Sequence, residues 1–224
     1  MARICIDQFY DWKKQGHRWV CLTAYDAPTA RVLESASVPM ILVGDSLGNV
    51  ILGHDSTVPV TMDDMVHHSA AVRRGAENTF VVCDMPFLAA QISDEDAIRN
   101  AGRLIQEGMA DAVKIEGGGA RVGTIRRIVD AGIPTMGHLG LTPQNATQLG
   151  GYKVQGNTPA SAAQILKDAR AIEESGAFAL VLECVPTGLA EKIQGALSIP
   201  VIGIGAGLSV DAQVLVFHDL VGLS

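Results

Sequence analysis

Acidic side chains stand at the ends of several short apolar runs in the sequence. Asp45 follows MILVG, Asp84 follows TFVVC and Glu183 follows ALVL, while the segment AVKIE carries Lys114 and ends in Glu116. Carboxylates gathered at one place repel one another, so protonation, a lysine or a divalent cation must relieve the repulsion. Oxygen ligands favour a hard cation such as Mg2+, which takes one or two carboxylates directly and keeps several waters.

Each of these acids also has a simpler interpretation. A single aspartate after a strand is more often a turn residue or a helix N-cap than a ligand. Strand alternation sets this group apart, because the apolar residue two positions before each aspartate or Glu183 shares its face, and Lys114 shares the face of Glu116. Four converging carboxylates with a lysine inside a strand favour a functional site.

The histidines do not form a zinc set. His67 and His68 are adjacent, and no H-E-x-x-H pattern occurs. We expect these two, with His17 and His54, on the surface or in loops. His138 has two open interpretations, a hydrogen bond to a substrate or a packed core residue.

The elements that must position these residues alternate regularly. Short apolar runs predict eight strands, at 20–24, 40–44, 79–83, 112–115, 135–138, 179–182, 201–204 and 213–217. The stretches between them predict helices at 27–35, 62–74, 94–106, 121–130, 161–174 and 188–197. Thr61 with Asp64 and Ser93 with Asp96 are N-cap signals.

Parallel strands covered by helices, eight in a chain of this length, favour a closed (β/α)8 TIM barrel. We expect one domain over residues 1–224, with its chemistry at the carboxyl ends of the strands. Strand count alone also permits an open doubly wound sheet.

Composition narrows the class of protein. The 224 residues include 17 Lys and Arg against 24 Asp and Glu, a formal charge of −7, and 48% are hydrophobic. This composition builds a core and argues against nucleic-acid or anionic membrane partners. Four cysteines without C-x-x-C spacing, and an N-terminus without an apolar signal region, predict a cytoplasmic protein with reduced thiols.

Two long connections and two glycine clusters complete the pattern. The segments 46–59 and 140–159 are longer than usual strand-to-helix loops, which predicts lids or binding segments. GIGAG, from Gly203, and the three glycines after Glu116 let a backbone approach a ligand, but a glycine-rich turn is the better interpretation of each. Neither is a Walker loop or a G-x-G-x-x-G fingerprint.

Segments in order along nearly the whole chain resemble the ketopantoate hydroxymethyltransferase family. They are LTAYDAPTA, ILVGDSLGNVILGHDSTVPVTMDDM, DMPF, DAVKIEGG, MGHLGLTPQ, GGYKVQG, VLECVP, IPVIGIGAG and QVLVFHD. The resemblance implies a barrel of the phosphoenolpyruvate/pyruvate-like superfamily, cytoplasmic and decameric, with one Mg2+ per subunit. It implies transfer of a hydroxymethyl unit from 5,10-methylenetetrahydrofolate to 3-methyl-2-oxobutanoate, giving 2-dehydropantoate for pantothenate biosynthesis.

The resemblance also implies roles for particular residues. The metal site would fall on Asp45, Asp84 and Glu116, and Glu183 would accept the proton. The 2-oxo acid would contact Asp45, Ser46, Asp84 and Lys114. Further candidates for substrate or folate contacts are His138, Tyr152 and Lys153. Such a metal would stabilise the enolate that forms when the C3 proton of the 2-oxo acid leaves.

The chain departs from the family in two places. Asp211, Ala212 and Gln213 stand where the family has Asp-Gly-Gln, so a left-handed turn at Ala212 would cost about 1 kcal/mol. The sequence also ends at Ser224, directly after the last predicted strand, so we expect the C-terminal helical segment to be absent from it. The back of that strand then relies on a tail outside the sequence or on a neighbouring subunit.

Three hypotheses follow, of which the hydroxymethyltransferase is the first. The second keeps the metal site in a Mg2+-dependent carbon–carbon lyase or phosphonomutase of the wider superfamily. Such lyases commonly use a cysteine in a loop, and none of the four cysteines lies in a long predicted loop. The third is a catalytically silent barrel that serves as a binding or assembly scaffold.

Overall fold

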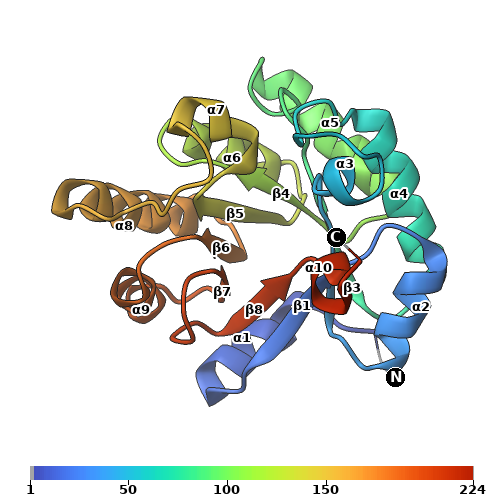
Figure 1. Ribbon diagram of the computed structural model, residues 1–224, viewed down its shortest axis with the longest axis horizontal. Coiled ribbons are helices and arrows are strands. Elements are labelled where there is room, and N and C mark those ends of the chain that lie inside the picture. Colours follow the sequence, from blue (N-terminus) through green and yellow to red (C-terminus); the bar gives the residue numbers. More distant parts are fainter. Residues whose placement is uncertain (1–2, 224) are drawn as a thin grey trace. The chain divides into compact units, whose positions relative to one another are not determined.

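The computed structural model describes residues 3–223, and eight parallel strands organise it (Figure 1). The strands are β1 (Trp19–Thr23), β2 (Met40–Val43), β3 (Phe80–Asp84), β4 (Ala112–Glu116), β5 (Thr135–Gly140), β6 (Ala179–Glu183), β7 (Val201–Ile204) and β8 (Ala212–Leu215). They follow one another in a closed barrel in the order β1 to β8. The predicted fold class is confirmed, and the open doubly wound sheet is excluded.

Contacts divide the chain into two compact units. Unit 1 comprises Met1–Cys5, Val20–Lys114 and Val214–Ser224, and unit 2 comprises Ile6–Trp19 and Ile115–Gln213. In unit 1, β2 pairs with β1 and β3, and β3 pairs with β4 through Asp84 opposite Lys114. In unit 2, β6 pairs with β5 and β7, and β7 pairs with β8.

Helices follow the strands in each unit. Unit 1 contains α2 (Ala27–Ser35), α3 (Leu47–Val50), α4 (Met62–Gly75), α5 (Asp94–Gln106) and α10 (Phe217–Val221). Unit 2 contains α1 (Ile6–Gln15), α6 (Arg121–Asp130), the 3-10 turn η1 (Pro143–Asn145), α7 (Ala146–Leu149), α8 (Pro159–Glu174) and α9 (Thr187–Ala196). Figure 1 shows α8 and α9 side by side, next to β6 and β7.

Capping explains why the starts of two helices were predictable. The Thr61 side chain accepts a hydrogen bond from the Asp64 backbone N–H, and the Asp64 carboxylate accepts one from the Thr61 backbone N–H. Ser93 accepts from the Asp96 backbone N–H in the same way. Each cap satisfies amide groups that the first turn of a helix leaves without partners. Helices α4 and α5 therefore begin at the predicted residues.

The end of the chain differs from the prediction. Strand β8 ends at Leu215, not at Phe217, and Phe217 begins α10. Ala212 lies inside β8 and is not among the residues with positive φ, so the predicted left-handed turn and its cost do not arise. Helix α1 differs from the prediction too, because it precedes the first strand and so lies outside the strand–helix alternation.

An aspartate ties the fourth strand of each unit to the strand before it. In unit 1, Asp111 exchanges two hydrogen bonds with Val81, from its own N–H to the Val81 oxygen and from the Val81 N–H to its carboxylate, both 2.8 Å. In unit 2, Asp211 makes the same pair with Val201, at 2.9 and 2.8 Å. The two units thus have the same pair of hydrogen bonds, between an aspartate and the backbone of the preceding strand, at the amino ends of their strands.

A cation accompanies each aspartate. Arg73 pairs with Asp111 in unit 1. In unit 2, Lys13 lies 2.8 Å from the Asp211 carboxylate and also donates to the Gln194 oxygen at 3.2 Å. The Lys13 and Asp211 side chains are 11% and 6% exposed, so this ion pair is nearly buried. Removing one partner of such a pair leaves an uncompensated charge away from water.

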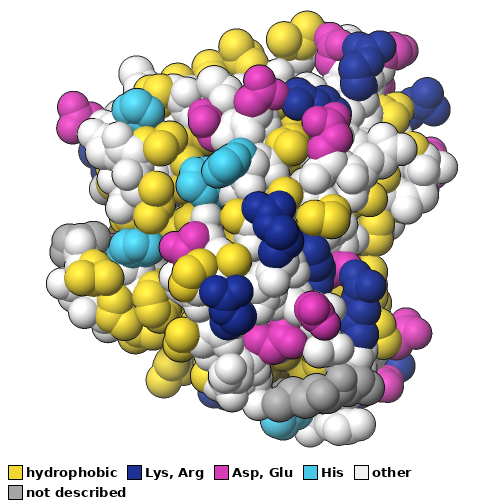
Figure 2. All heavy atoms as spheres, turned by 90° about the vertical axis from the view of Figure 1, so that its right-hand side faces the viewer, with side chains coloured by type: hydrophobic (Ala, Val, Ile, Leu, Met, Phe, Trp, Pro, Cys, Tyr) yellow, Lys and Arg dark blue, Asp and Glu magenta, His cyan; other side chains and the backbone are white. Residues whose placement is uncertain are grey.

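Charged side chains lie on the surface of the protein (Figure 2). Acidic and basic side chains are intermixed with apolar ones on the face shown in Figure 2. Exposed pairs such as Arg103 with Asp63 and Glu107 contribute little to stability, because water and salt screen them. Within residues 3–223, no helix is both long and apolar enough to cross a bilayer.

The buried pair in unit 2 gives a stability prediction. Lys13→Ala should lower the free energy of unfolding by about 3 kcal/mol, measured by urea denaturation, because Asp211 loses its cationic partner in a nearly buried place. Lys14→Ala is the matched control on the same helix, since Lys14 and Asp11 are 76% and 62% exposed. It should change the free energy by less than about 0.5 kcal/mol. Equal effects of the two variants would contradict this account.

Candidate active site

The carboxyl ends of β2, β3 and β4 gather charged groups in unit 1. Asp84 accepts a hydrogen bond from the Asp45 backbone N–H at 3.1 Å through Oδ2, and its Oδ1 lies 3.0 Å from Lys114 Nζ. Both aspartates are 3% exposed and Lys114 is 4% exposed. The structure therefore brings together three of the predicted residues, with Ser46 adjacent to Asp45.

Gly44 makes room for this group. A Cβ at this position would lie 2.8 Å from Ser46 Oγ and 3.5 Å from Asp84 Oδ2. The first distance is too short for a carbon and an oxygen atom that are not bonded to each other. The Ser46 side chain would therefore have to shift. The glycine before Asp45 thus lets the chain turn out of β2 directly beside the two carboxylates.

Two carboxylates and one ammonium give this group one negative charge in excess. The donors that the aspartates offer are oxygens, which suits a hard cation. Among residues 3–223, no group of three or more His, Cys, Asp and Glu side chains is arranged to hold a metal ion. The metal site at Asp45, Asp84 and Glu116 stays a prediction.

A second group of predicted residues lies in unit 2. The imidazole of His138 lies between two carboxylates, with Nδ1 3.4 Å from Glu116 Oε1 and Nε2 3.2 Å from Glu183 Oε2. His138 and Glu116 are buried, whereas the Glu183 side chain is 18% exposed. Glu183 is therefore held by its neighbour and still accessible from outside.

The long loop after β5 is hydrogen-bonded to the backbone of Glu183 and Cys184. At its start the Leu141 N–H donates to the Glu183 oxygen at 2.8 Å, and near its end the Gln155 N–H donates to the Cys184 oxygen at 2.8 Å. Between them, the Gln144 N–H donates to the Glu116 carboxylate at 3.1 Å. The loop thus contacts both acids of this group through main-chain donors.

Gly140 permits the first of these contacts. Its φ is +93°, and a Cβ there would lie 2.1 Å from the Glu183 backbone oxygen. Only glycine adopts this conformation readily and allows so close an approach. Any larger residue at position 140 would push β5 and the Glu183 backbone apart.

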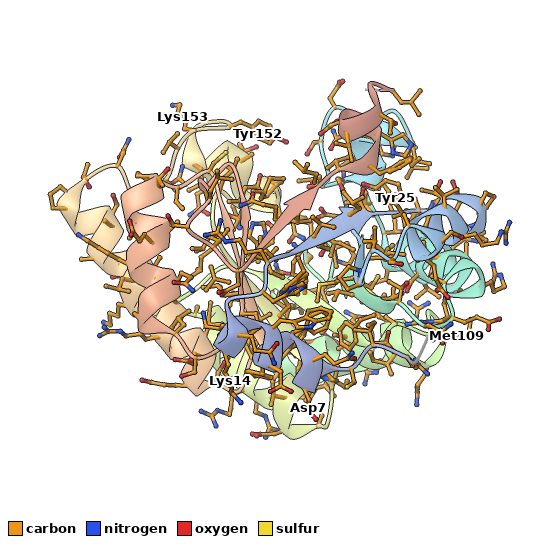
Figure 3. The ribbon with its side chains drawn as sticks, turned by 90° about the horizontal axis from the view of Figure 1, so that it is seen from below. Asp7, Lys14, Tyr25, Met109, Tyr152 and Lys153 are labelled. Atoms are coloured by element: carbon orange, nitrogen blue, oxygen red, sulfur yellow. The ribbon has the colours of Figure 1, made fainter. Side chains whose placement is uncertain are left out.

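The remaining predicted residues lie outside both groups. Tyr152 and Lys153 are exposed, and Figure 3 shows their side chains pointing away from the ribbon. His17, His54 and His67 are exposed as expected, whereas His68 is half-buried, with Nδ1 2.7 Å from the Tyr25 oxygen. A cavity of about 610 Å3 lies next to the loop in unit 2, a size typical of small-molecule sites. Its lining residues include Asn157, Leu166, Pro186, Leu189 and Lys192.

One residue of unit 1 was missed. The Tyr25 hydroxyl lies 2.8 Å from Ser46 Oγ, and Tyr25 is 1% exposed. An aromatic residue after an apolar run indicates core packing, so its type alone gave no reason to single it out. The only available signal was its place directly after the first predicted strand, where the chemistry of a barrel lies.

The cysteines beside these groups are not activated nucleophiles. Burial raises the pKa of the Cys21 and Cys83 thiols, and the charge of Asp84 adds to the effect. Burial and then the charge of Glu183 raise the pKa of Cys184. A raised pKa leaves less thiolate at neutral pH, and the thiolate is the reactive form.

Thiol labelling tests this electrostatic arrangement. With iodoacetamide at pH 8, the exposed Cys5 should be alkylated before Cys184, and Cys21 and Cys83 only after unfolding. Glu183→Gln should speed the labelling of Cys184, because the variant removes the charge that helps to raise its pKa. Peptide mass spectrometry measures each rate, with Cys5 as the internal control. An unchanged Cys184 rate in this variant would refute the effect of the Glu183 charge on the Cys184 thiol.

Comparison with known proteins places these features in a family. The sequence profile of ketopantoate hydroxymethyltransferase matches residues 3–224. A 3-methyl-2-oxobutanoate hydroxymethyltransferase from Heliobacterium modesticaldum is 57% identical over 221 residues, which cover 99% of this chain and 80% of the relative. One from Moorella thermoacetica is 58% identical over 222 residues, covering 99% and 82%.

Solved structures with low sequence identity share the fold. Phosphonopyruvate hydrolase in complex with oxalate and Mg2+ superposes with a TM-score of 0.74 at 12% identity, over 99% of this chain and 83% of that one. A 2,3-dimethylmalate lyase of the PEP mutase/isocitrate lyase superfamily gives 0.70 at 17% identity, over 97% and 82%. At such identities the likeness concerns the barrel alone.

Proposed function

The chain belongs to the ketopantoate hydroxymethyltransferase family, and we propose that it transfers a hydroxymethyl unit to 3-methyl-2-oxobutanoate, giving 2-dehydropantoate. The proposed one-carbon donor is 5,10-methylenetetrahydrofolate. The observation that carries the proposal is a match over nearly the whole chain that includes Asp45, Asp84, Glu116 and Glu183, all at strand ends. The methylene group carries no oxygen, so the new hydroxyl must come from water.

Strand β4 carries both Lys114 and Glu116. Residues two apart in a strand point to the same face and lie about 7 Å apart along it. Lys114 is paired with Asp84, and Glu116 contacts His138.

The donor chemistry fits one Mg2+ per subunit. Asp45, Asp84 and Glu116 would hold it, since all three offer carboxylate oxygens and the unit 1 group carries excess negative charge. Bound there, the cation would supply Lewis-acid polarisation of the keto oxygen of the 2-oxo acid. Mn2+ and Co2+ accept the same donors.

Glu183 is the proposed base. A general base needs a carboxylate that reaches the substrate, and Glu183 is the more exposed of the two acids that contact His138. It would take the C3 proton of 3-methyl-2-oxobutanoate, and C3 would then form the bond to the one-carbon unit. The His138 imidazole, 3.2 Å from Oε2, would keep the Glu183 carboxylate in a fixed orientation.

Lys114 and Ser46 would bind the charged end of the substrate. The ammonium of Lys114 can offset the charge that develops on the enolate oxygen, and a serine hydroxyl can donate to the substrate carboxylate. The cavity beside α8 and α9 is the place that we propose for part of the folate. One of its walls is Pro186, three residues after Glu183 and hence within about 11 Å along the chain.

We further propose that the protein works in the cytoplasm, in pantothenate biosynthesis, and as a homo-oligomer, the decamer that the family resemblance implies. These proposals rest on the family of the chain. The reduced state expected for the four cysteines agrees with a cytoplasmic place of action.

Proton exchange tests the proposed activity. In D2O with Mg2+, the protein should exchange the C3 proton of 3-methyl-2-oxobutanoate, and NMR follows the loss of its signal. Glu183→Gln should reduce the exchange rate at least about a hundredfold, within the range that general base catalysis contributes. The matched control is Glu174→Gln, at the exposed end of α8.

The outcomes separate the three hypotheses. Equal exchange in the Glu183→Gln variant would remove this residue from the role of base. A folded protein that binds Mg2+ and exchanges no proton would point to a scaffold. Addition of 5,10-methylenetetrahydrofolate distinguishes the transferase from a lyase by the product that forms.

Metal binding tests the ligand assignment. Asp45→Ala and Asp84→Ala should each weaken Mg2+ binding at least about tenfold in calorimetric titrations, because each removes a carboxylate ligand. Far-UV circular dichroism should stay unchanged, since the loss is local. Asp130→Ala, at the exposed end of α6, is the control. Unchanged titration curves for both site variants would refute the assignment.

A further inference from the structure

Tyr25 links several elements of unit 1 around its buried ring. The hydroxyl lies 2.8 Å from Ser46 Oγ, after β2, and the backbone oxygen lies 2.7 Å from His68 Nδ1, on α4. Its ring centroid lies 5.6 Å from that of His218, on α10. Figure 3 shows Tyr25 beside the end of β1. These contacts hold Tyr25 at its hydroxyl, its backbone oxygen and its ring, so the hydroxyl has a defined position.

The hydrogen bond between the Tyr25 and Ser46 hydroxyls can run in either direction, because each hydroxyl has one proton and can also accept. Two residues before Tyr25, Thr23 Oγ1 accepts a hydrogen bond of 3.0 Å from the Phe217 backbone N–H.

A bound carboxylate would fix the direction of this bond. A carboxylate only accepts, so Ser46 would have to use its single proton on the substrate. The bond between Ser46 and Tyr25 would then be donated by Tyr25, and both hydroxyls would donate towards the substrate.

We propose that Tyr25 is a positioning residue that directs the Ser46 hydroxyl proton at the carboxylate of the 2-oxo acid. The inference rests on the proposed function, since it concerns the same substrate. Tyr25 touches Ser46 rather than the reacting atoms, so it acts through its neighbour. Without the tyrosine hydroxyl, the Ser46 oxygen loses the hydrogen bond that Tyr25 donates to it. The Ser46 hydroxyl can then rotate, and its proton is no longer directed at the substrate.

The environment of Tyr25 keeps its phenol protonated, which the hydrogen bond to Ser46 requires. Burial raises the pKa of Tyr25 to about 12, and the charges of Asp84 and Asp219 act in the same direction. The phenol therefore stays protonated throughout the pH range in which a cytoplasmic enzyme works. A protonated phenol is what can donate to Ser46.

A double-mutant cycle tests the positioning role. Tyr25→Phe should raise the Kd for 3-methyl-2-oxobutanoate, measured calorimetrically with Mg2+ present, and its KM about three- to tenfold, the range expected for one hydrogen bond. The value of kcat should change less than twofold. Ser46→Ala should give a similar rise, and adding Tyr25→Phe to Ser46→Ala should raise the Kd no further.

A matched control variant keeps the result interpretable. Tyr10→Phe, on α1, removes a tyrosine hydroxyl from the other unit and should leave Kd and KM unchanged. Urea denaturation of each variant separates loss of binding from loss of folding.

The failures of the two proposals look different. A wild-type protein that exchanges no C3 proton and makes no product loses the proposed function. If the wild type is active and Tyr25→Phe has unchanged Kd and KM, the positioning role is wrong and the function stands. Additive effects of Tyr25→Phe and Ser46→Ala on Kd would also overturn the role, because they would mean that the two residues act independently.

Discussion

Buried carboxylates need compensation, and this requirement shapes both units of the molecule. In unit 1, the Asp84 carboxylate is paired with Lys114 and accepts a hydrogen bond from the backbone N–H of Asp45. In unit 2, Glu116 and Glu183 lie on opposite sides of His138. Charges removed from water are costly unless they are paired. The residues that stabilise the acids are therefore also the residues proposed for proton transfer, so in the proposed site stability and chemistry depend on the same contacts.

The opposite ends of the strands use acids for a different purpose. Asp111 and Asp211 each stand before a strand, bind the backbone of the preceding strand twice and pair with a cation. The carboxylate oxygens in these two arrangements accept from main-chain amides, from local cations and, in the case of Asp211, from the Gln194 side-chain amide. This fits the general division in barrels, where the amino ends of strands serve stability and the carboxyl ends serve chemistry. The same residue type thus has two roles, decided by the strand end that carries it.

The sequence predicted what local rules govern. Helix starts followed from caps such as Thr61, and the grouping of Asp84 with Lys114 is what strand alternation favours. The contact of Tyr25 with Ser46 could not be predicted, because it depends on how β1 and β2 register and on a ring whose type indicates only core packing. Strand β8 was placed too late because its apolar residues continue into α10 without a break in pattern. The single domain over 1–224, the absent C-terminal segment and the decamer stay predictions.

The hydrogen bonds at the two ends of the loop after β5 determine which parts of its sequence can change. Leu141 and Gln155 are both bonded to the backbone of consecutive residues, Glu183 and Cys184. The position of the Glu183 backbone therefore depends on the two ends of the loop and not on residues 146–154. In the proposed enzyme, a change of sequence within 146–154 could alter which co-substrate is accepted while the Glu183 backbone stays in place. Gln144 is excluded from such changes, because its N–H contacts the Glu116 carboxylate.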